Sequence, residues 1–319
     1  MFYSENEARR LVINAGHVLL EKKLIARTWG NISARISENE FIITPSGRAY
    51  DTLTSDELVK VRVDDLSYEG SIKPSSEKGV HAVGYALRGD VNFIIHTHQF
   101  YASAICAGEK DTDFAPCAGY GLPGTKTLRE SIRKAVKDNP EKNSFLMAKH
   151  GAICFGKDME SAFEEADTLE KNCKALFESR VGLSDIKPSS ETLFGLEGRY
   201  GSVLRDSDGT VMTVCAEGKS LRAYLDDFAQ MIGPDARLVL ADGNMAASAL
   251  RGRNAVLLRN EGALCVADTA DDAEAVSMIL RKNCAAALYV QRKHPMSVAD
   301  AKLQRIVYLM KYSKQKDKK

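Results

Sequence analysis

Apolar positions near the start of the chain recur at the spacing of a helix, and those that follow fall into short β-rich runs. Ser4 precedes the helical pattern, and Glu7 three positions later completes a capping box. The pattern itself is made by Leu11, Val12, Ala15, Val18, Leu19 and Leu24. Residues 32–36 and 41–44 are rich in β-formers and are separated by a polar turn. The sequence therefore predicts a helix followed by a β-hairpin.

Helical and strand patterns alternate further along the chain. Ser75 or Ser76 is a suitable N-cap for a helix that runs to about residue 87. The other predicted helices cover residues 99–107, 128–137 and 159–179, and the predicted strands cover residues 91–95, 144–148 and 152–155. Such alternation is typical of a layered α/β domain.

Two blocks of the chain resemble later blocks, which indicates an internal duplication. Residues 145–176 align without gaps with residues 256–287, and both blocks contain a Lys-Asn-Cys run. Residues 90–104 match residues 235–249 at a wider separation, so the second copy is expected to lack a segment that the first carries between the blocks. The sequence thus predicts a tandem duplication with domains at residues 1–182 and 192–319.

Length and charge narrow the class of protein. The 319 residues favour about two domains. Hydrophobic residues make up 44% of the chain and charged residues 27%, which fits a globular protein and excludes a disordered one. Lys and Arg total 44 against 43 Asp and Glu. No basic surplus is therefore available to neutralise the phosphates of a nucleic acid, and the lysine-rich residues 311–319 are expected to be solvated.

The chain also lacks the marks of a membrane or secreted protein. No apolar run reaches the ~18 residues of a membrane span, and the acidic N-terminal residues do not fit a secretory signal. The seven cysteines are odd in number and form no C-x-x-C pair, which argues against a disulfide framework or a thiolate zinc site. These features predict a cytoplasmic protein with no membrane partner.

Three of the six histidines fall where their rings can converge. His96 and His98 end an apolar run, and residues two apart on a strand point to the same face. His150 lies between a predicted strand and Gly151, where a tight backbone lets the ring turn inward. Three imidazoles with an open fourth position make a catalytic zinc site. Taken alone, these histidines also fit ordinary hydrogen-bonded groups.

Upstream residues offer a carboxylate and anion-binding groups. Glu77 precedes the H-x-H pair in the sequence and lies at the start of a predicted helix. It is a candidate general base beside a metal, or a carboxylate that interacts favourably with the helix dipole. Hydroxyl groups, amides and a helix N-terminus that suit a phosphate come from Thr28, Asn31, Ser46, Gly47, Ser75 and Ser76. Each of these residues also fits a turn or a cap.

The combination of motifs is more specific than any one of them. The motifs occur in the order Gly30-Asn31-Ile32-Ser33, Ile43-Thr44-Pro45-Ser46-Gly47, Pro74-Ser75-Ser76-Glu77, His96-Thr97-His98 and Lys149-His150-Gly151. In order and spacing they resemble the class II aldolase/adducin family, and within it the fuculose-phosphate aldolases, over about residues 5–180. The resemblance implies an α/β/α fold with a central mixed or antiparallel sheet, duplicated here in tandem.

The resemblance also assigns roles to individual residues. It implies that His96, His98 and His150 bind zinc and that Glu77 is the acid/base group. It implies phosphate contacts from Thr28, Asn31, Ser46, Gly47, Ser75 and Ser76. The glutamate after Ser-Ser is similar to the aldolase branch and unlike the epimerase branch. Residues 108–117 lack the tyrosine of the fuculose-phosphate aldolases, so the role of proton donor is not transferred to Tyr120.

The implied function is a zinc-dependent aldolase that cleaves or forms a carbon–carbon bond in a small phosphorylated ketose through a metal-stabilised enediolate. A metal-dependent decarboxylase or epimerase at the same site is one alternative. An adducin-like binding module without catalysis is another, which the retained histidines and Glu77 disfavour. The resemblance also implies a homo-oligomer, and two fused copies predict a dimer that mimics a four-fold ring.

The second copy is expected to be catalytically inactive. The positions aligned with His96, His98 and His150 are Ala241, Gly243 and Glu261, which cannot together bind zinc. Residues 187–191 repeat residues 73–77 letter for letter, but no histidine strand follows them. This match is interpreted as coincidence in a linker. His81, one turn beyond Glu77, is either a surface residue or a group that supports the site.

Overall fold

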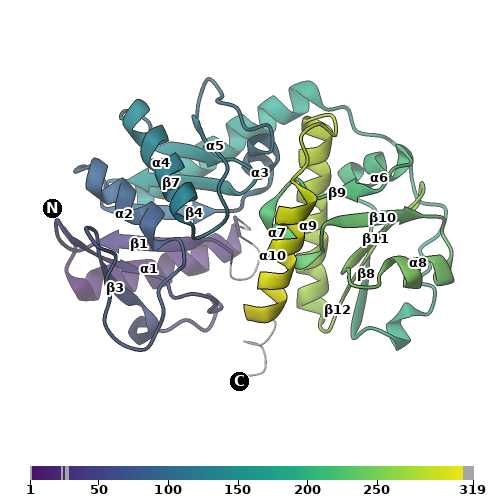
Figure 1. The fold of residues 1–319 in the computed structure, drawn as a ribbon, viewed down its shortest axis with the longest axis horizontal. Helices are drawn as coiled ribbons and strands as arrows, with labels where there is room; N and C mark the ends of the chain where they lie inside the picture. The colour runs from purple at the N-terminus through teal and green to yellow at the C-terminus, as the bar shows by residue number, and fades with distance from the viewer. Residues whose placement is uncertain (1, 23, 26–28, 312–319) are drawn as a thin grey trace. The chain divides into compact units, whose positions relative to one another are not determined.

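The computed structural model describes residues 2–22, 24–25 and 29–311, and it forms two compact units, Met1–Ala175 and Leu176–Lys319 (Figure 1). Thr28 and residues 312–319 of the lysine-rich end lie outside the described residues. Each unit contains one β-sheet with helices beside it, which confirms the prediction of an α/β protein. In the ranges described, no helix is both long enough and apolar enough to cross a bilayer.

The first unit is built on a seven-stranded sheet in the order β3-β2-β1-β4-β7-β6-β5. Its strands are β1 (Asn31–Arg35), β2 (Glu40–Ile43), β3 (Val59–Arg62), β4 (Phe93–Thr97), β5 (Cys117–Ala118), β6 (Ser144–Met147) and β7 (Gly151–Gly156). Its helices are α1 (Glu5–Glu21), the short 3-10 helix η1 (Ser55–Glu57), α2 (Lys78–Leu87), α3 (Phe100–Cys106), α4 (Lys126–Asp138) and α5 (Met159–Arg180), which continues into the second unit. The sheet is mixed, because β5 and β6 are parallel and the other neighbours are antiparallel.

Helices cover both faces of this sheet. On one face, Val80 of α2 and Leu128 of α4 belong to the same buried apolar cluster as residues of β2, β4, β6 and β7. Ser33 of β1 bonds to His81 of α2. Since neighbouring residues of a strand point to opposite faces, the buried Ile32 points to the other face, where α1 lies against β1. The first unit therefore has three layers.

Local hydrogen bonds explain where these elements begin. Ser4 caps α1 as predicted, because its Oγ accepts the N–H of Glu7 at 3.3 Å. The hairpin of β1 and β2 is confirmed. The prediction that Ser75 or Ser76 caps the next helix is wrong, because the Ser75 Oγ accepts the N–H of Glu77 in a turn before the helix. The N-cap of α2 is Glu77 itself.

The second unit is built on a five-stranded sheet in the order β8-β12-β11-β10-β9. Its strands are β8 (Ser202–Asp206), β9 (Leu221–Arg222), β10 (Asp235–Val239), β11 (Ala255–Leu258) and β12 (Gly262–Ala267). Its helices are η2 (Leu196–Gly198), α6 (Gly209–Ala216), α7 (Asp226–Met231), α8 (Gly243–Ala249), α9 (Ala270–Tyr289) and α10 (Val298–Lys311). This sheet is also mixed, because β10 and β11 are parallel.

Four strands of the two sheets follow the same plan. β4-β7-β6-β5 in the first unit corresponds to β8-β12-β11-β10 in the second, with an antiparallel pair at one end and a parallel pair at the other. His96 lies opposite Ile153, and Arg205 lies opposite Leu264. Ile153 and Leu264 are aligned positions of the gap-free sequence repeat. By strand register, Arg205 is therefore the counterpart of His96.

This register corrects part of the sequence alignment. The match of residues 90–104 with residues 235–249 is wrong, because β10 pairs with β11 in parallel, as β5 pairs with β6. The counterparts of His96 and His98 are therefore Arg205 and Ser207, and not Ala241 and Gly243. The expected loss of a segment between the two blocks is also wrong, because α8 precedes β11 as α4 precedes β6.

Candidate metal centre

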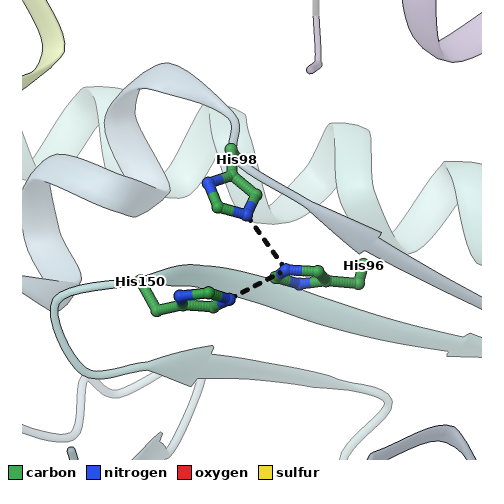
Figure 2. A group of neighbouring side chains, drawn as sticks. All are labelled: His96, His98 and His150. Carbon is green, nitrogen blue, oxygen red and sulfur yellow. Dashed lines mark hydrogen bonds between the residues drawn. The ribbon is translucent and has the colours of Figure 1, made fainter. Parts of the chain in front are cut away.

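Three histidines meet where β4 ends beside the turn between β6 and β7, with their rings directed toward one another (Figure 2). His96 lies in β4, and His98 follows just after that strand. His150 lies in the turn, next to Lys149 with its left-handed φ of 59°. The antiparallel pairing of β4 with β7 brings this turn to the end of β4. Segments far apart in the sequence thus supply one centre.

A glycine lets the turn approach the strand. A Cβ atom on Gly151 would lie 2.3 Å from the carbonyl oxygen of Thr97, a distance that no side chain tolerates. Thr97 stands between His96 and His98 in the sequence. Gly151 is therefore what allows His150 to lie against the H-x-H pair.

The ring nitrogens of the three histidines have the spacing of metal ligands. His96 Nε2 lies 3.1 Å from His98 Nε2 and 3.1 Å from His150 Nε2, and all three side chains are buried. Four ligands held at about 2.0–2.1 Å in a tetrahedron lie about 3.3 Å apart. Within the described residues, this is the one group of three or more His, Cys, Asp or Glu side chains suited to a metal ion.

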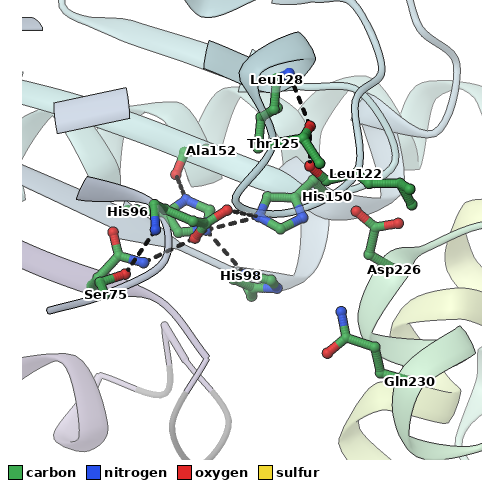
Figure 3. A network of polar contacts seen from close by, with 12 residues as sticks. Ser75, His96, His98, Leu122, Thr125, Leu128, His150, Ala152, Asp226 and Gln230 are labelled. Carbon is green, nitrogen blue, oxygen red and sulfur yellow. Dashed lines mark hydrogen bonds and ion pairs between the residues drawn. The ribbon is translucent and has the colours of Figure 1, made fainter. Parts of the chain in front are cut away.

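A backbone contact fixes which nitrogen of His96 faces the centre. His96 Nδ1 lies 2.8 Å from the carbonyl oxygen of Ala152, which can only accept a hydrogen bond (Figure 3). The proton of the neutral ring is therefore on Nδ1, and the lone pair is on Nε2. The donor set fits a divalent metal ion.

The carboxylate of Glu77 touches two of the histidines. Its Oε1 lies 2.9 Å from His150 Nε2, and its Oε2 lies 3.3 Å from His96 Nε2. Asn31 Nδ2 donates a hydrogen bond to Oε2 at 2.9 Å. Burial raises the pKa of the Glu77 carboxyl, but the positive charge that His96 and His150 carry when protonated, together with hydrogen bonds from His150 and Asn31, outweighs burial. The pKa lies well below its ordinary value, and Glu77 is a carboxylate.

A chain of buried polar side chains leads away from Glu77. His81 Nε2 lies 2.5 Å from Asn31 Oδ1, and His81 Nδ1 lies 2.7 Å from Ser33 Oγ. Ser33 Oγ also lies 2.7 Å from the hydroxyl of Tyr85. Because the Asn31 amide donates to Glu77, its oxygen accepts from His81 Nε2. His81 Nδ1 then accepts from Ser33, and Ser33 accepts from Tyr85, so each group of the chain has a defined direction.

His81 is therefore a group that supports the site and not a surface residue. Its side chain is fully buried. Burial, followed by the charge of His96, lowers the pKa of His81 to about 3. The ring is neutral near pH 7. From the sequence the role of His81 is open and Ser33 and Tyr85 are missed, although Ser33 belongs to one of the motifs and His81 and Tyr85 are one helical turn apart.

Two of the segments predicted to contact a phosphate lie side by side near Glu77. An isolated bridge joins Pro45 to Pro74, and the N–H of Ser46 donates to the carbonyl oxygen of Lys73 at 3.0 Å. Ser75 is therefore close to the turn that contains Ser46 and Gly47. Figure 3 shows Ser75 beside the centre.

The remaining residues of that set differ in how they are placed. Both polar atoms of the Asn31 side chain are hydrogen-bonded, the nitrogen to Glu77 and the oxygen to His81. Ser76 is exposed and borders a recess that is also lined by Lys78, Lys126 and Arg129. Thr28 cannot be placed, because it lies outside the described residues. The three cations beside Ser76 were not among the residues singled out from the sequence.

The second unit has no histidine at the corresponding positions. Arg205, Ser207 and Glu261 stand where His96, His98 and His150 stand in the first unit, and Arg205 Nη2 lies 3.2 Å from Glu261 Oε2. Residues 187–191 are bonded to this pair through the N–H groups of Ser189 and Ser190. The segment predicted to be a linker is thus hydrogen-bonded to the position that corresponds to His150.

Comparisons with known proteins agree with this geometry. The sequence profile of the Class II Aldolase and Adducin N-terminal domain matches residues 10–177. A 5-deoxy-D-ribulose 1-phosphate aldolase of Bacillus thuringiensis serovar kurstaki is 29% identical over 57% of this chain and 91% of that enzyme. An L-fuculose phosphate aldolase of Methanococcus maripaludis is 30% identical over 49% of this chain and 88% of that enzyme.

A solved structure extends the comparison to the fold. An L-fuculose 1-phosphate aldolase with 27% identity superposes with a TM-score of 0.50 and covers 58% of this chain and 93% of that one. Relatives of this chain include aldolases, a dehydratase and a decarboxylase of phosphorylated sugars. With a matching profile over more than half of its residues and the buried histidine triad within that range, the chain belongs to the class II aldolase and adducin family.

Proposed function

We propose that this chain is a zinc-dependent aldolase that cleaves or forms a carbon–carbon bond in a small phosphorylated ketose. The observation that carries the proposal is the contact of the Glu77 carboxylate with His96 and His150 at the centre of three converging imidazoles. A carboxylate beside a three-histidine site is the arrangement needed to move a proton next to a Lewis acid. The named aldolases among the relatives support this activity.

The three histidines and the metal have separate tasks in this proposal. His96, His98 and His150 would hold Zn²⁺, and the carbonyl oxygen of Ala152 orients the ring of His96. Bound there, the ion supplies a positive charge that stabilises negative charge on substrate oxygens. Glu77 takes or returns the proton at the reacting carbon or its hydroxyl, and its buried carboxylate is held ready by Asn31.

The substrate phosphate is assigned to the turn of Ser46 and Gly47 and to the segment of Ser75 and Ser76, with Asn31 beside Glu77. Thr28 stays a prediction from the sequence. Hydroxyl and N–H groups of these segments suit an anion without a net basic charge. The second unit supports this assignment, because Ser190, the counterpart of Ser76 in the repeated segment, donates its N–H to a carboxylate. The cations beside Ser76 add favourable charge. Binding the phosphate remotely orients the bond that reacts.

We further propose that the second unit is a divergent copy of the first and has no metal centre. The domains are then residues 1–182 and a second domain that includes residues 192–319 and the bonded segment 187–191. The shared strand order and the gap-free sequence repeat support the copy relation. A pairing of two such chains would place four copies of the fold in one ring.

Metal content tests the centre directly. His98→Ala is expected to lower bound zinc from about one ion per chain to near zero, because two imidazoles hold the ion far more weakly than three. The measurement is elemental analysis of purified protein after dialysis. His17→Ala is the matched control, since His17 is exposed on α1 and lies outside the centre. Wild-type levels of zinc in His98→Ala would contradict the assignment.

The role of Glu77 is tested by changing its charge and keeping its shape. Glu77→Gln is expected to lower kcat for retro-aldol cleavage by about 10²–10⁴-fold, because the variant cannot accept a proton, while zinc stays bound. The assay screens phosphorylated ketoses and records triose phosphate, carbon dioxide and dehydrated product in parallel. Release of carbon dioxide or dehydration without triose phosphate would replace the aldolase proposal by one of the other activities named among the relatives.

The hydrogen-bonded series of side chains from Glu77 to Tyr85 predicts that His81 affects both kcat and the pH dependence of the free energy of unfolding. His81→Gln should lower kcat with zinc content and KM little changed, because the Asn31 amide loses its fixed partner. The unfolded wild-type chain binds a proton at His81 below pH 6.5, and the folded chain binds it only near pH 3. Wild type should therefore lose stability as pH falls through this window, by about 1.4 kcal/mol per pH unit from this group.

Urea unfolding of metal-free protein at pH 7.5 and pH 5 measures that slope. The loss between the two pH values is expected to be smaller in His81→Gln, which has no group to protonate at this position. Equal losses in the two proteins would show that His81 is not the buried neutral ring described here.

Exposed apolar residues of the second unit add support to the proposed dimer of this chain. Leu303, Ile306 and Met310 follow one another at helical spacing on α10 and are 47%, 53% and 66% exposed. Light scattering is expected to give twice the chain mass of 35.0 kDa or a higher multiple. A stable monomer at micromolar concentration would contradict the dimer and leave the metal centre unaffected.

A further inference from the structure

We propose that an Arg205–Glu261 ion pair, held by residues 187–191, takes the place of the metal centre in the second unit. The inference rests on the copy relation stated under the proposed function and not on the reaction assigned to the first unit. Its elements all lie within residues 176–319, the range of the second unit.

The turn that carries His150 is repeated around Glu261. Lys149 and Asn260, which precede these two residues, both have a φ of 59°, in the left-handed region that such residues seldom adopt. The N–H of His150 bonds to the carbonyl oxygen of Met147 at 2.9 Å, and the N–H of Glu261 bonds to that of Leu258 at 3.0 Å. Glu261 therefore leaves its turn in the same backbone setting as His150.

The approach of this turn to the neighbouring strand is also repeated. A Cβ atom on Gly151 would lie 2.3 Å from the Thr97 carbonyl oxygen, and one on Gly262 would lie 2.3 Å from the Asp206 carbonyl oxygen. Thr97 follows His96, and Asp206 follows Arg205. Strand register and close approach thus place Arg205 at the position of His96 by two separate observations.

The repeated pentapeptide lies at the matching place in both units. In the first unit, Glu77 of this segment contacts the Nε2 atom of His150 at 2.9 Å. In the second unit, the N–H groups of Ser189 and Ser190 donate to Glu261 Oε2 at 2.9 Å and 3.1 Å, and the Ser189 hydroxyl bonds to Oε1. The same pentapeptide therefore contacts His150 in the first unit and Glu261, the counterpart of His150, in the second.

Arg205 completes the substitute centre with charge-assisted hydrogen bonds. Its Nη2 lies 3.2 Å from Glu261 Oε2 and 2.7 Å from the Glu261 carbonyl oxygen, and its Nη1 donates to the carbonyl oxygen of Thr192 at 2.9 Å. The side chains of Arg205 and Glu261 are only 10% and 13% exposed. A guanidinium and a carboxylate neutralise each other, whereas three neutral imidazoles gather around a cation.

The ion pair makes the second unit independent of metal. This unit ties its own preceding segment, residues 187–192, to its sheet through hydrogen bonds to Glu261 and Arg205. Loss of metal should therefore loosen the first centre and leave this segment in place. The two units are predicted to differ in whether loss of metal loosens them, although four strands in each follow the same order.

Hydrogen exchange in the full chain tests the attachment of the segment. Glu261→Ala is expected to speed exchange of the Ser189 and Ser190 amides at least tenfold, because both lose their acceptor. The matched control is Asp185→Asn, an exposed carboxylate a short way before Ser189. Unchanged protection of these amides in Glu261→Ala, or equal loss in the control, would overturn the proposal.

Conversion of the pair to histidines tests the correspondence of positions. The triple variant Arg205→His, Ser207→His and Glu261→His is expected to bind one more zinc ion per chain than wild type, measured by elemental analysis on protein whose circular dichroism matches wild type. A folded triple variant with no added ion would contradict the correspondence. The readout is the difference between variant and wild type, so it holds whatever the first unit binds and separates this inference from the proposed activity.

Discussion

The close approach of the β6–β7 turn to the end of β4 is the constraint on which the site depends. Gly151 permits a contact with the Thr97 carbonyl that any side chain would prevent, and this contact brings His150 to the H-x-H pair. Once the three rings converge, an uncompensated gathering of nitrogens around one point is stable only with a proton or a cation among them. Glu77 stands against two of the rings and faces that same point. The close backbone contact at Gly151 is therefore required before the three histidines can form this centre.

The sequence predicts residues well where chemistry depends on spacing along the chain. His96 and His98 are two apart on a strand, and the Ser-Ser-Glu segment opens a helix, so these features are visible without a structure. The sequence does not predict the series of hydrogen bonds from Asn31 to Tyr85. Which group donates and which accepts in that series depends on which amide atom of Asn31 faces Glu77. β3 alternates buried Val59 and Val61 with exposed residues, and such alternation is a pattern from which a strand can be predicted. β5 is too short to leave a periodic signal.

The second unit shows where sequence alignment fails for a physical reason. Short helices and strands with Ala and Ser at similar spacing align by composition, as residues 90–104 and 235–249 do. The relative direction of two neighbouring strands is not subject to such chance matches. The parallel pairing of β10 with β11 therefore decides which strands of the two units correspond. With the register corrected, the repeated pentapeptide and Glu261 fall into contact. The chain then has one centre suited to a cation and one built around an ion pair.

The central claim is that a metal ion binds among His96, His98 and His150 and not between Arg205 and Glu261. Anomalous X-ray diffraction from crystals grown with zinc, with data collected on both sides of the zinc absorption edge, tests it most directly. We predict one strong peak at about 2.0–2.1 Å from each of the three Nε2 atoms and none between Arg205 and Glu261. A peak at the second location, or none among the three histidines, would contradict this claim.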